Sequence, residues 1–469
     1  MSSTRTLASY LSGLRFEDLP PEVVEKGKLA ILDAVGNCIG GYPLALSRTF
    51  LDLAGSLGSG RPEATLIGDG DRVSVSAAAF GNAALTTMLD YCDYTRSESG
   101  RCATWLGAMA VPAAMAAGES RSISGRELIA SVVAGYEGAA RIVHSMDMTL
   151  EQSQKIGGET LSVFAAVCAA GRALGLDEDE MLSAVGMAGI YTPVPGWYKW
   201  VGDEGLTPRK DIKQGWAWMC MTGAFAAVSA RQGLRMLQEN HVLDGDKGIS
   251  RMVGMDIFHE ERLTADLGSR YYLPQFTSKV YPGCAITHTA VSGVLEIARD
   301  HGVTPQDVES IQVVTNKQDG IGFDDRDPQG LSDLQFSMPY QVAAALAAGD
   351  GGPGWYCDST AASPQVRDLA RRVELSFDDE CERLFRESHL RVSKVAVHTR
   401  SGARYTRRVD GVGHVSEAGE IRSKFTTTAS QVIDPDHVSR ILDTVDTLED
   451  QDGLAPLMDL LAPLPDHVR

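Results

Sequence analysis

Apolar residues recur at three- and four-residue spacing through most of the first 265 residues of the chain. This period places one face of an α-helix against a core. It predicts helices at 4–14, 22–39, 43–57, 76–89, 108–117, 125–144, 161–174, 180–190 and 211–232. Many of the apolar positions hold Ala or Gly, which let neighbouring helices approach closely. The first half of the chain is therefore predicted to be a helical domain.

The pattern changes near residue 276. Alternating or continuous apolar runs predict strands at 310–315, 373–377, 394–399 and 403–409, among helices at 288–300 and 339–348. Helical spacing returns at 420–430 and 435–447. We therefore expect a mainly α protein, in which residues 1–266 and 417–469 form one large all-helical domain. Residues 267–416 are expected to form an inserted, smaller α+β lid domain.

Composition narrows the class of protein. The 469 residues are 43% hydrophobic and 22% charged, as in a globular chain with more than one core. There are 62 acidic and 43 basic residues, so the net charge of −19 argues against nucleic acid or an anionic membrane as a partner. A site that binds an anion must therefore be a small cluster of basic residues on an otherwise acidic protein.

Cysteine spacing and apolar runs bear on the compartment. The eight cysteines form no CxxC pair, which is typical of reduced thiols in the cytoplasm. The first residues contain no long apolar stretch of the kind found in secretory signals. The uncharged run 214–230 contains polar residues and reaches only the lower limit of a membrane span. We therefore expect a cytoplasmic protein with no membrane partner.

Common cofactor motifs are absent from the sequence. There is no GxGxxG opening a helix after a strand, no GxxxxGK[ST] and no GxSxG. His259-Glu260 begins a zinc-protease motif, but position 263 is not a histidine. The sequence therefore predicts neither a metal nor an organic cofactor.

The segment QFTSKVYPGCAITHTAVSGVLEIA, residues 275–298, concentrates acid–base residues. Its Pro-Gly pair predicts a turn, and Thr287 can cap the helix that follows, so His288 falls in the first helical turn. A helix N-terminus disfavours imidazolium and attracts anions. A neutral His288 beside Lys279 would suit proton transfer on a carboxylate-bearing substrate. A structural role for both residues is the commoner case, and the local pattern leaves it open.

Two other segments hold candidate residues. Asp90 and Asp93, in LDYCDYTR, stand three apart at the end of a predicted helix beside arginines, where a solvated helix end is the plainer interpretation. The segment 191–210 is aromatic, charged and too long for a simple connector, which indicates function or an interface. It ends at Lys210. Its Trp197, Tyr198 and Trp200 could equally serve a core or a dimer contact.

Six segments in order carry a family resemblance: LDYCDYT, AVPAAMAAGE, SVFAAVCAAGRALGLD, RKDIKQGWAWMCMTGAFAAVSARQGL, SKVYPGCAITH and QFSMPYQVAAALAAGD. Together they resemble the MmgE/PrpD family, which includes 2-methylcitrate dehydratase, cis-aconitate decarboxylase and iminodisuccinate epimerase. The resemblance implies a cofactor-free homodimeric enzyme whose site lies between a helical domain and a smaller lid.

The resemblance also assigns roles by motif position. The implied catalytic residues are His288 as proton shuttle, Lys279 as a carboxylate holder, and Asp90 and Tyr340 as donors, acceptors or orienting groups. The expected substrate-binding residues are Lys210, which matches a family lysine, and Asp93, Glu159, Trp105 and Cys284, which stand in or beside the matching segments. The expected partner is a small-molecule carboxylate.

Two positions depart from the family pattern. Trp105 stands in the region where the family has a His-Pro pair, and Glu159, in GGETLSV, stands where it has a second histidine. An anionic Glu159 would repel a tricarboxylate, so a smaller, less acidic or partly aromatic acid is expected.

We therefore predict a cofactor-independent lyase or isomerase that acts on a small carboxylic acid through a carbanion or enolate, of the dehydratase or decarboxylase type. The alternatives are an epimerase or isomerase of a carboxylate, and a non-catalytic dimeric scaffold derived from the family.

Overall fold

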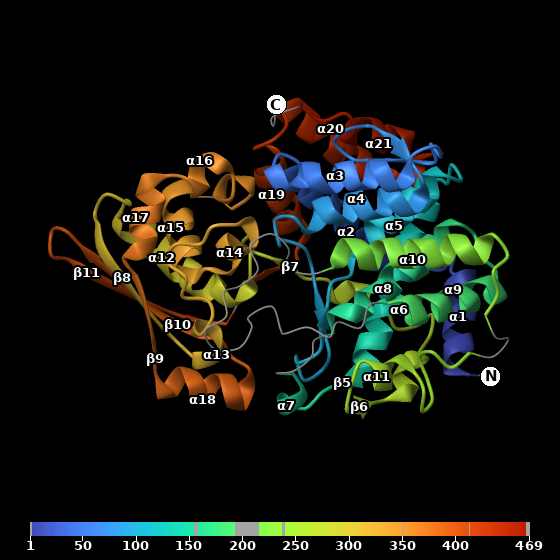
Figure 1. The fold of residues 1–469 in the computed structure, drawn as a ribbon, viewed down its shortest axis with the longest axis horizontal. Coiled ribbons are helices and arrows are strands. Elements are labelled where there is room, and N and C mark those ends of the chain that lie inside the picture. Colours follow the sequence, from blue (N-terminus) through green and yellow to red (C-terminus); the bar gives the residue numbers. More distant parts are fainter. Residues whose placement is uncertain are drawn as a thin grey trace.

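The computed structural model describes residues 2–153, 158–192, 215–236, 240–349, 351–411 and 413–465. Figure 1 shows two bodies side by side, a larger helical body on the right and a smaller body with a sheet on the left. The helices of the larger body are α1 (Ser3–Gly13), α2 (Pro21–Gly41), α3 (Ala45–Gly58), α4 (Val75–Thr87), α5 (Gly107–Glu119), α6 (Gly125–Ser145), α8 (Val163–Ala173), α9 (Glu178–Tyr191), α10 (Trp216–Arg231), α19 (Ala418–Ala429), α20 (Pro435–Asp446) and α21 (Ala455–Leu461). The prediction of a mainly α protein is confirmed.

Small residues set the spacing of the central helices. The helix α8 packs against α5, α6 and α10. A Cβ on Gly135 of α6 would lie 2.7 Å from the carbonyl oxygen of Ala165, and one on Gly223 of α10 would lie 2.7 Å from the amide nitrogen of Val167. Larger side chains at these two positions would push the helices apart.

The smaller body is built on a four-stranded sheet of order β11-β10-β8-β9. Its strands are β8 (Val308–Thr315), β9 (Val373–Phe377), β10 (Val392–Thr399) and β11 (Arg404–Asp410). The pair β8–β9 is parallel, with Ile311 opposite Val373, and the other pairs are antiparallel. Helix α12 (His288–His301) packs against β10 and β11, while α15 (Met338–Ala348) packs against α12, α17 (Pro364–Arg371) and β9. Short helices α13, α14, α16 and α18 complete the body at Lys317–Gly320, Leu331–Phe336, Asp358–Ala361 and Asp379–Ser388.

Buried hydrophobic side chains form two clusters. One lies among the helices of the larger body, and the other lies among α12, α15 and the sheet. Leu89 and Tyr91 follow α4 in the chain, yet they belong to the second cluster. The loop after α4 therefore reaches across the junction between the two bodies.

A two-stranded ribbon also lies at this junction. Strand β7 (Ser278–Lys279) leads into the smaller body, β12 (His414–Val415) leads out of it, and they pair antiparallel with Lys279 opposite His414. Helix α19, which follows β12, packs against α2, so the chain returns to the body in which it began (Figure 1).

Most predicted elements are confirmed to within about two residues. The helices predicted at 22–39 and 125–144 span Pro21–Gly41 and Gly125–Ser145, and the strand at 373–377 spans Val373–Phe377. The helix predicted at 161–174 is preceded by a 3-10 turn, η2 (Glu159–Ser162).

All eight cysteines are free thiols. Across the described ranges, no single helix has the length and apolar character needed to cross a membrane. Helices α2 and α3 meet these two requirements only when they are taken together, and the bend between them is 106°.

Candidate active site

A buried ion pair links the loop after α4 to β7. The Lys279 ammonium donates to Asp90 Oδ1 at 2.6 Å, to the Asp90 carbonyl at 2.7 Å and to the Gly283 carbonyl at 3.1 Å. Lys279 is 3% exposed and Asp90 is fully buried. Burial alone would lower the pKa of Lys279, but the Asp90 carboxylate raises it, so the ammonium stays charged. Its three N–H groups already have three acceptors.

The acidic loop differs from its prediction. Helix α4 ends at Thr87, and Asp90 has φ of 48°, so Asp90 and Asp93 do not share a helical face. Both carboxylates are buried, so the solvated helix end expected for this segment is wrong. Tertiary contacts bury the two carboxylates, because each one hydrogen-bonds to a partner that is remote in the sequence.

Further hydrogen bonds fix the loop against the turn that follows β7. The Gly283 amide donates to the Leu89 carbonyl at 2.9 Å, and the Tyr91 hydroxyl donates to the Val280 carbonyl at 2.7 Å. Gly283 has φ of 97°, and a Cβ there would lie 2.4 Å from the Tyr356 hydroxyl. Only glycine fits this turn. The turn holds Lys279 within hydrogen-bond distance of Asp90.

His288 is the first residue of α12, as predicted from the Pro-Gly turn, and is 1% exposed. Neither ring nitrogen makes a hydrogen bond of normal geometry with any described residue, although the Gly283 backbone is near enough to offset part of the pKa shift described next. Burial lowers the pKa of His288 well below its usual range, and the positive charge of Lys279 lowers it further. The imidazole is therefore neutral at pH 7, with one unprotonated ring nitrogen.

Thr287 does not cap this helix as predicted. Its single hydroxyl hydrogen faces two acceptors, the Cys284 carbonyl at 2.9 Å and Gln341 Oε1 at 2.8 Å. A 3-10 turn at Ala285–Thr287 puts Thr287 in a helical conformation, which leaves its side chain unable to reach the amides ahead. Cys284 is buried in the second cluster, and its amide donates to the Gln335 carbonyl at 3.0 Å.

Tyr340 lies behind the histidine. Its hydroxyl is buried and donates to the Trp355 carbonyl at 2.6 Å, and burial raises its pKa. The Trp355 ring stacks on Tyr281 with centroids 5.9 Å apart, and the Tyr281 ring meets His288 edge-on at 5.5 Å. Tyr340 therefore supports the wall that holds His288.

Asp93 binds the start of α5. It accepts hydrogen bonds from the Gly107 amide at 3.0 Å and from the Tyr136 hydroxyl at 2.9 Å. Burial raises the pKa of Asp93 to about 7, and the nearby Asp33 carboxylate adds to the effect. Asp93 therefore holds the segment just after Trp105.

A second buried ion pair stands beside the first, and sequence reasoning missed it. Lys424 of α19 donates to Asp33 of α2 at 2.6 Å, and both contact the Ser278 hydroxyl. The available signal was Asp33 itself, the one charged residue in the apolar stretch 29–39 of a predicted helix. The Lys279 and Lys424 pairs together join α2, the loop after α4, β7 and α19.

The two positions that depart from the family pattern lie on adjoining turns. The Trp105 amide donates to Ser162 Oγ at 3.4 Å, and Glu159 begins the same turn, η2. The Trp105 ring lies 4.8 Å from that of Trp216. Glu159 is 7% exposed, and Trp105 is partly buried against the helical cluster.

Lys210, together with Trp197, Tyr198 and Trp200, lies outside the described residues. Among the described residues, no three His, Cys, Asp or Glu side chains are arranged to hold a metal ion.

Comparison with known proteins identifies the family. The MmgE/PrpD N-terminal domain matches residues 5–258, and the MmgE/PrpD C-terminal domain matches residues 281–450. The chain belongs to the MmgE/PrpD family. The family resemblance of its ordered segments is confirmed, and the stretch between the two matches, 259–280, includes β7 and Lys279.

Several MmgE/PrpD relatives match over nearly their full length. The cis-aconitate decarboxylase of Aspergillus terreus is 24% identical over 98% of this chain and 95% of its own. The human cis-aconitate decarboxylase is 22% identical over 100% of this chain and 96% of its own, and the Mus musculus enzyme is 22% identical over 98% and 93%. These identities mark a divergent member of the family.

Proposed function

We propose that the protein is a lyase that acts on a small carboxylic acid through a carbanion or enolate, by decarboxylation or dehydration. The observation that carries this proposal is the neutral, buried His288, whose ring nitrogens make no hydrogen bond of normal geometry with any described residue, near the charged Asp90–Lys279 pair. The names of the relatives support the same reaction class.

The proposed chemistry assigns one task to each group. A carbanion beside a carboxylate forms when a carbon-bound proton leaves, as in dehydration, or when carbon dioxide leaves, as in decarboxylation. In dehydration, neutral His288 takes the carbon-bound proton, and the imidazolium then returns a proton to the departing hydroxyl, which leaves as water. In decarboxylation, His288 must first gain a proton from solvent, and it then delivers that proton to the carbanion. The positive charge near His288 stabilises the developing negative charge in an enclosed site.

Lys279 would act within a pair. All three N–H groups of the ammonium already donate hydrogen bonds. To bind a substrate carboxylate, Lys279 would give up its hydrogen bond to the Asp90 or Gly283 carbonyl and donate to the substrate instead. Asp90 would then keep the ammonium in place while the substrate binds. The proposal requires no metal and no organic cofactor.

The test follows carbon-bound protons of candidate acids in D₂O by NMR. The panel contains cis-aconitate, 2-methylcitrate and small unsaturated or hydroxy acids. We expect wild type to convert at least one acid, or to exchange its proton for deuterium. The His288→Ala variant should lower the rate by about 10²-fold or more, the scale of a lost acid–base group.

The matched control is His259→Ala, because the side chain of His259 is 41% exposed. This variant should keep the wild-type rate. If no acid reacts or exchanges in wild type, the lyase proposal fails and the non-catalytic scaffold stands. Proton exchange with neither loss of carbon dioxide nor loss of water would favour the epimerase alternative.

A further inference from the structure

Lys424 of α19 holds the chain on both sides of the ion pair in the candidate active site. Its ammonium donates to the Ser278 hydroxyl and to the Tyr91 carbonyl, each at 2.5 Å. Ser278 directly precedes Lys279 in the chain, and Tyr91 directly follows Asp90. One ammonium therefore joins the two segments that carry Lys279 and Asp90.

Asp33 of α2 fixes the position of this ammonium. Its carboxylate accepts a hydrogen bond from Lys424 at 2.6 Å and one from the Ser278 hydroxyl at 3.0 Å. All three side chains are buried in the protein. The three N–H groups of Lys424 thus meet three acceptors, on Asp33, Ser278 and Tyr91. They leave no N–H group of Lys424 for a substrate, so any part it plays in the reaction goes through other residues.

Tyr91 extends this constraint to the turn after β7. The Lys424 ammonium lies 3.9 Å from the centroid of the Tyr91 ring, within the range of a cation–π contact. At the far end of that ring, the Tyr91 hydroxyl donates to the Val280 carbonyl at 2.7 Å. The backbone and the side chain of Tyr91 are therefore both fixed between Lys424 and the turn.

Asp90 has a backbone conformation that needs such support. Its φ of 48° lies in the left-handed region, which is unfavourable for residues other than glycine. Such a conformation persists only where the surrounding contacts impose it. Lys279 binds the carboxylate and the carbonyl of Asp90, and Lys424 binds the carbonyl of the next residue, Tyr91. Without Lys424, the chain beside Asp90 would lose its closest hydrogen-bond donor.

The charge of Lys424 also reaches His288. Burial lowers the pKa of His288, the positive charge of Lys279 lowers it further, and His414 and Lys424 act in the same direction. Lys424 therefore lies close enough to influence the proposed acid–base group as well as the ion pair.

We propose that Lys424 is a positioning residue that fixes Asp90 and Lys279 for the proposed reaction and touches no substrate itself. This inference rests on the proposed function, since it assigns part of the same site to α19. A reacting group that is misplaced by about 1 Å can lower a rate by about 10²-fold. The loss of Lys424 should therefore slow the reaction even in a protein that remains folded.

The test compares the NMR assay and amide hydrogen exchange in wild type, in Lys424→Met and in the double variant Lys424→Met with Asp33→Asn. The single variant leaves the buried Asp33 carboxylate without its partner, which destabilises the fold. The double variant removes both charges, so it separates positioning from stability.

The matched control is Lys28→Met with Glu449→Gln. Lys28 also lies on α2, and it donates to Glu449 at 3.0 Å, so this pair likewise joins α2 to the C-terminal segment. Among the described residues, none of the Lys28 hydrogen bonds reaches β7 or the loop after α4.

We expect the double variant to unfold in urea at nearly the wild-type concentration and to have kcat/KM lowered by about 10-fold to 10²-fold. Amide exchange should become faster in the segments 88–94 and 278–284 and stay unchanged elsewhere, because these segments lose their common donor. The single variant should add a loss of global stability. The control should keep the wild-type kcat/KM and the wild-type exchange in both segments.

The inference is overturned if the double variant has the wild-type kcat/KM, or if its faster exchange is spread evenly over the chain, as a merely structural role would give. Exchange separates this inference from the proposed function. If wild type converts no acid but the double variant exchanges faster only in the two segments, the lyase proposal fails and the positioning by Lys424 stands. If wild type converts an acid and the double variant converts it equally fast, only the positioning fails.

Discussion

At the scale of single residues, we expect the Asp90–Lys279 pair to contribute both to the stability of the fold and to the proposed reaction. Removing one member of a buried pair leaves the other charge uncompensated, which costs about 3–5 kcal/mol. Removing both charges together costs much less. The two parts can therefore be separated by comparing single and double variants.

We expect Lys279→Ala to lower the free energy of unfolding by about 3–5 kcal/mol and to abolish turnover. The double variant Lys279→Met with Asp90→Asn should recover most of the stability, since Asn also tolerates the positive φ of residue 90. It should not recover turnover. Urea unfolding and the NMR assay measure the two effects. A double variant with wild-type turnover would contradict a chemical role for the pair.

Asp93 makes stability depend on pH. Its pKa is raised to about 7 in the folded protein, above its unfolded value, so folding favours the protonated acid. This contribution is fully present below the unfolded pKa, near 4, and is lost as the pH rises through the folded pKa. Glu137, whose pKa burial also raises to about 7, acts with the same sign.

Wild type should therefore lose stability between about pH 5 and pH 7, by about 1.4 kcal/mol per pH unit for each group. Asp93→Asn mimics the protonated acid and removes one titrating group. It should therefore reduce this slope by about 1.4 kcal/mol per pH unit. The exposed Asp52→Asn should leave the slope unchanged. Urea unfolding at several pH values measures it. An equal slope in wild type and Asp93→Asn would show that Asp93 is already ionised.

At the scale of elements, the start of α5 depends on a glycine. Gly107 donates its amide to Asp93, and a Cβ there would lie 2.5 Å from Asp93 Oδ1 and 2.4 Å from the Tyr136 hydroxyl. The position tolerates no side chain without displacing one of these partners.

We expect Gly107→Ala to lower the free energy of unfolding by about 1–3 kcal/mol, because it overpacks the site and breaks the helix cap. Gly419→Ala is the matched control. Nothing lies within 4 Å of a Cβ on Gly419 in α19, so alanine there should be neutral or stabilising. Thermal unfolding compares the two variants. A Gly107→Ala protein as stable as wild type would mean that the Asp93 contact is dispensable.

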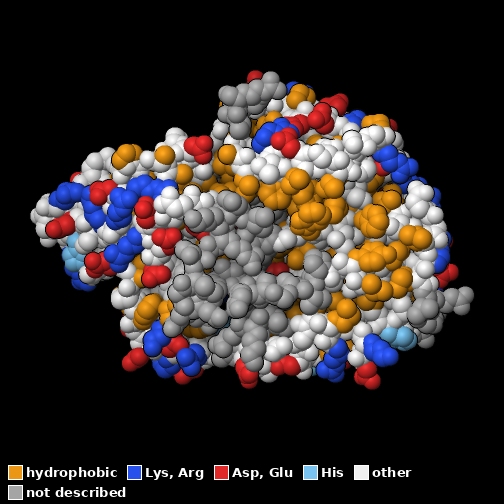
Figure 2. All heavy atoms as spheres, in the orientation of Figure 1, with side chains coloured by type: hydrophobic (Ala, Val, Ile, Leu, Met, Phe, Trp, Pro, Cys, Tyr) orange, Lys and Arg blue, Asp and Glu red, His pale blue; other side chains and the backbone are white. Residues whose placement is uncertain are grey.

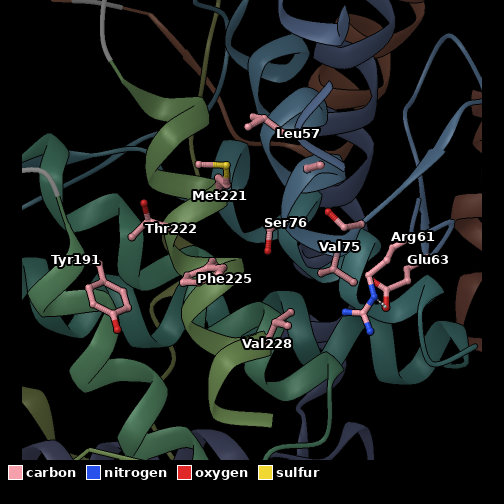
Figure 3. A pocket seen from close by; sticks show the side chains of 12 residues that line it. Leu57, Arg61, Glu63, Val75, Ser76, Tyr191, Met221, Thr222, Phe225 and Val228 are labelled. Carbon is pink, nitrogen blue, oxygen red and sulfur yellow. Dashed lines mark ion pairs between the residues drawn. The ribbon is translucent and has the colours of Figure 1, made fainter. Parts of the chain in front are cut away.

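At the scale of the whole molecule, the helical body exposes an apolar face. Figure 2 shows hydrophobic side chains gathered on this body, from the centre of the picture toward its right side. Leu57 of α3 and Phe225 of α10 are 53% and 51% exposed, and Tyr191, at the end of α9, is 46% exposed. These three residues, with Met221 and Val228, line a hollow of about 530 Å³ (Figure 3). Large exposed apolar patches are typical of interfaces.

We propose that a second copy of the chain covers this face, giving a homodimer formed through the helical bodies. Light scattering should give twice the 50.3 kDa mass of one chain. Phe225→Glu should shift the protein toward monomer, because it buries an unpaired charge in the interface. Met252→Glu, at a 49% exposed position on α11 (Ile249–Met252), should remain dimeric. A monodisperse wild-type monomer would refute the interface.

The sequence by itself determined the local structure. Helical and alternating periods located the helices and strands, because these periods reflect which face of each segment meets the core. The Pro-Gly turn placed His288 at the start of α12 for the same kind of local reason. The ordered segments identified the family, and hence the candidate residues to search for.

Tertiary structure alone decided the contacts. Lys279 meets Asp90 across 189 positions, and Lys424 meets Asp33 across 391. No local sequence pattern encodes such pairs. The interpretation of Asp90 and Asp93 as a solvated helix end was wrong because their partners are remote in the sequence. A charge in the sequence shows its sign, but burial and partners, which depend on the whole fold, decide what that charge can do.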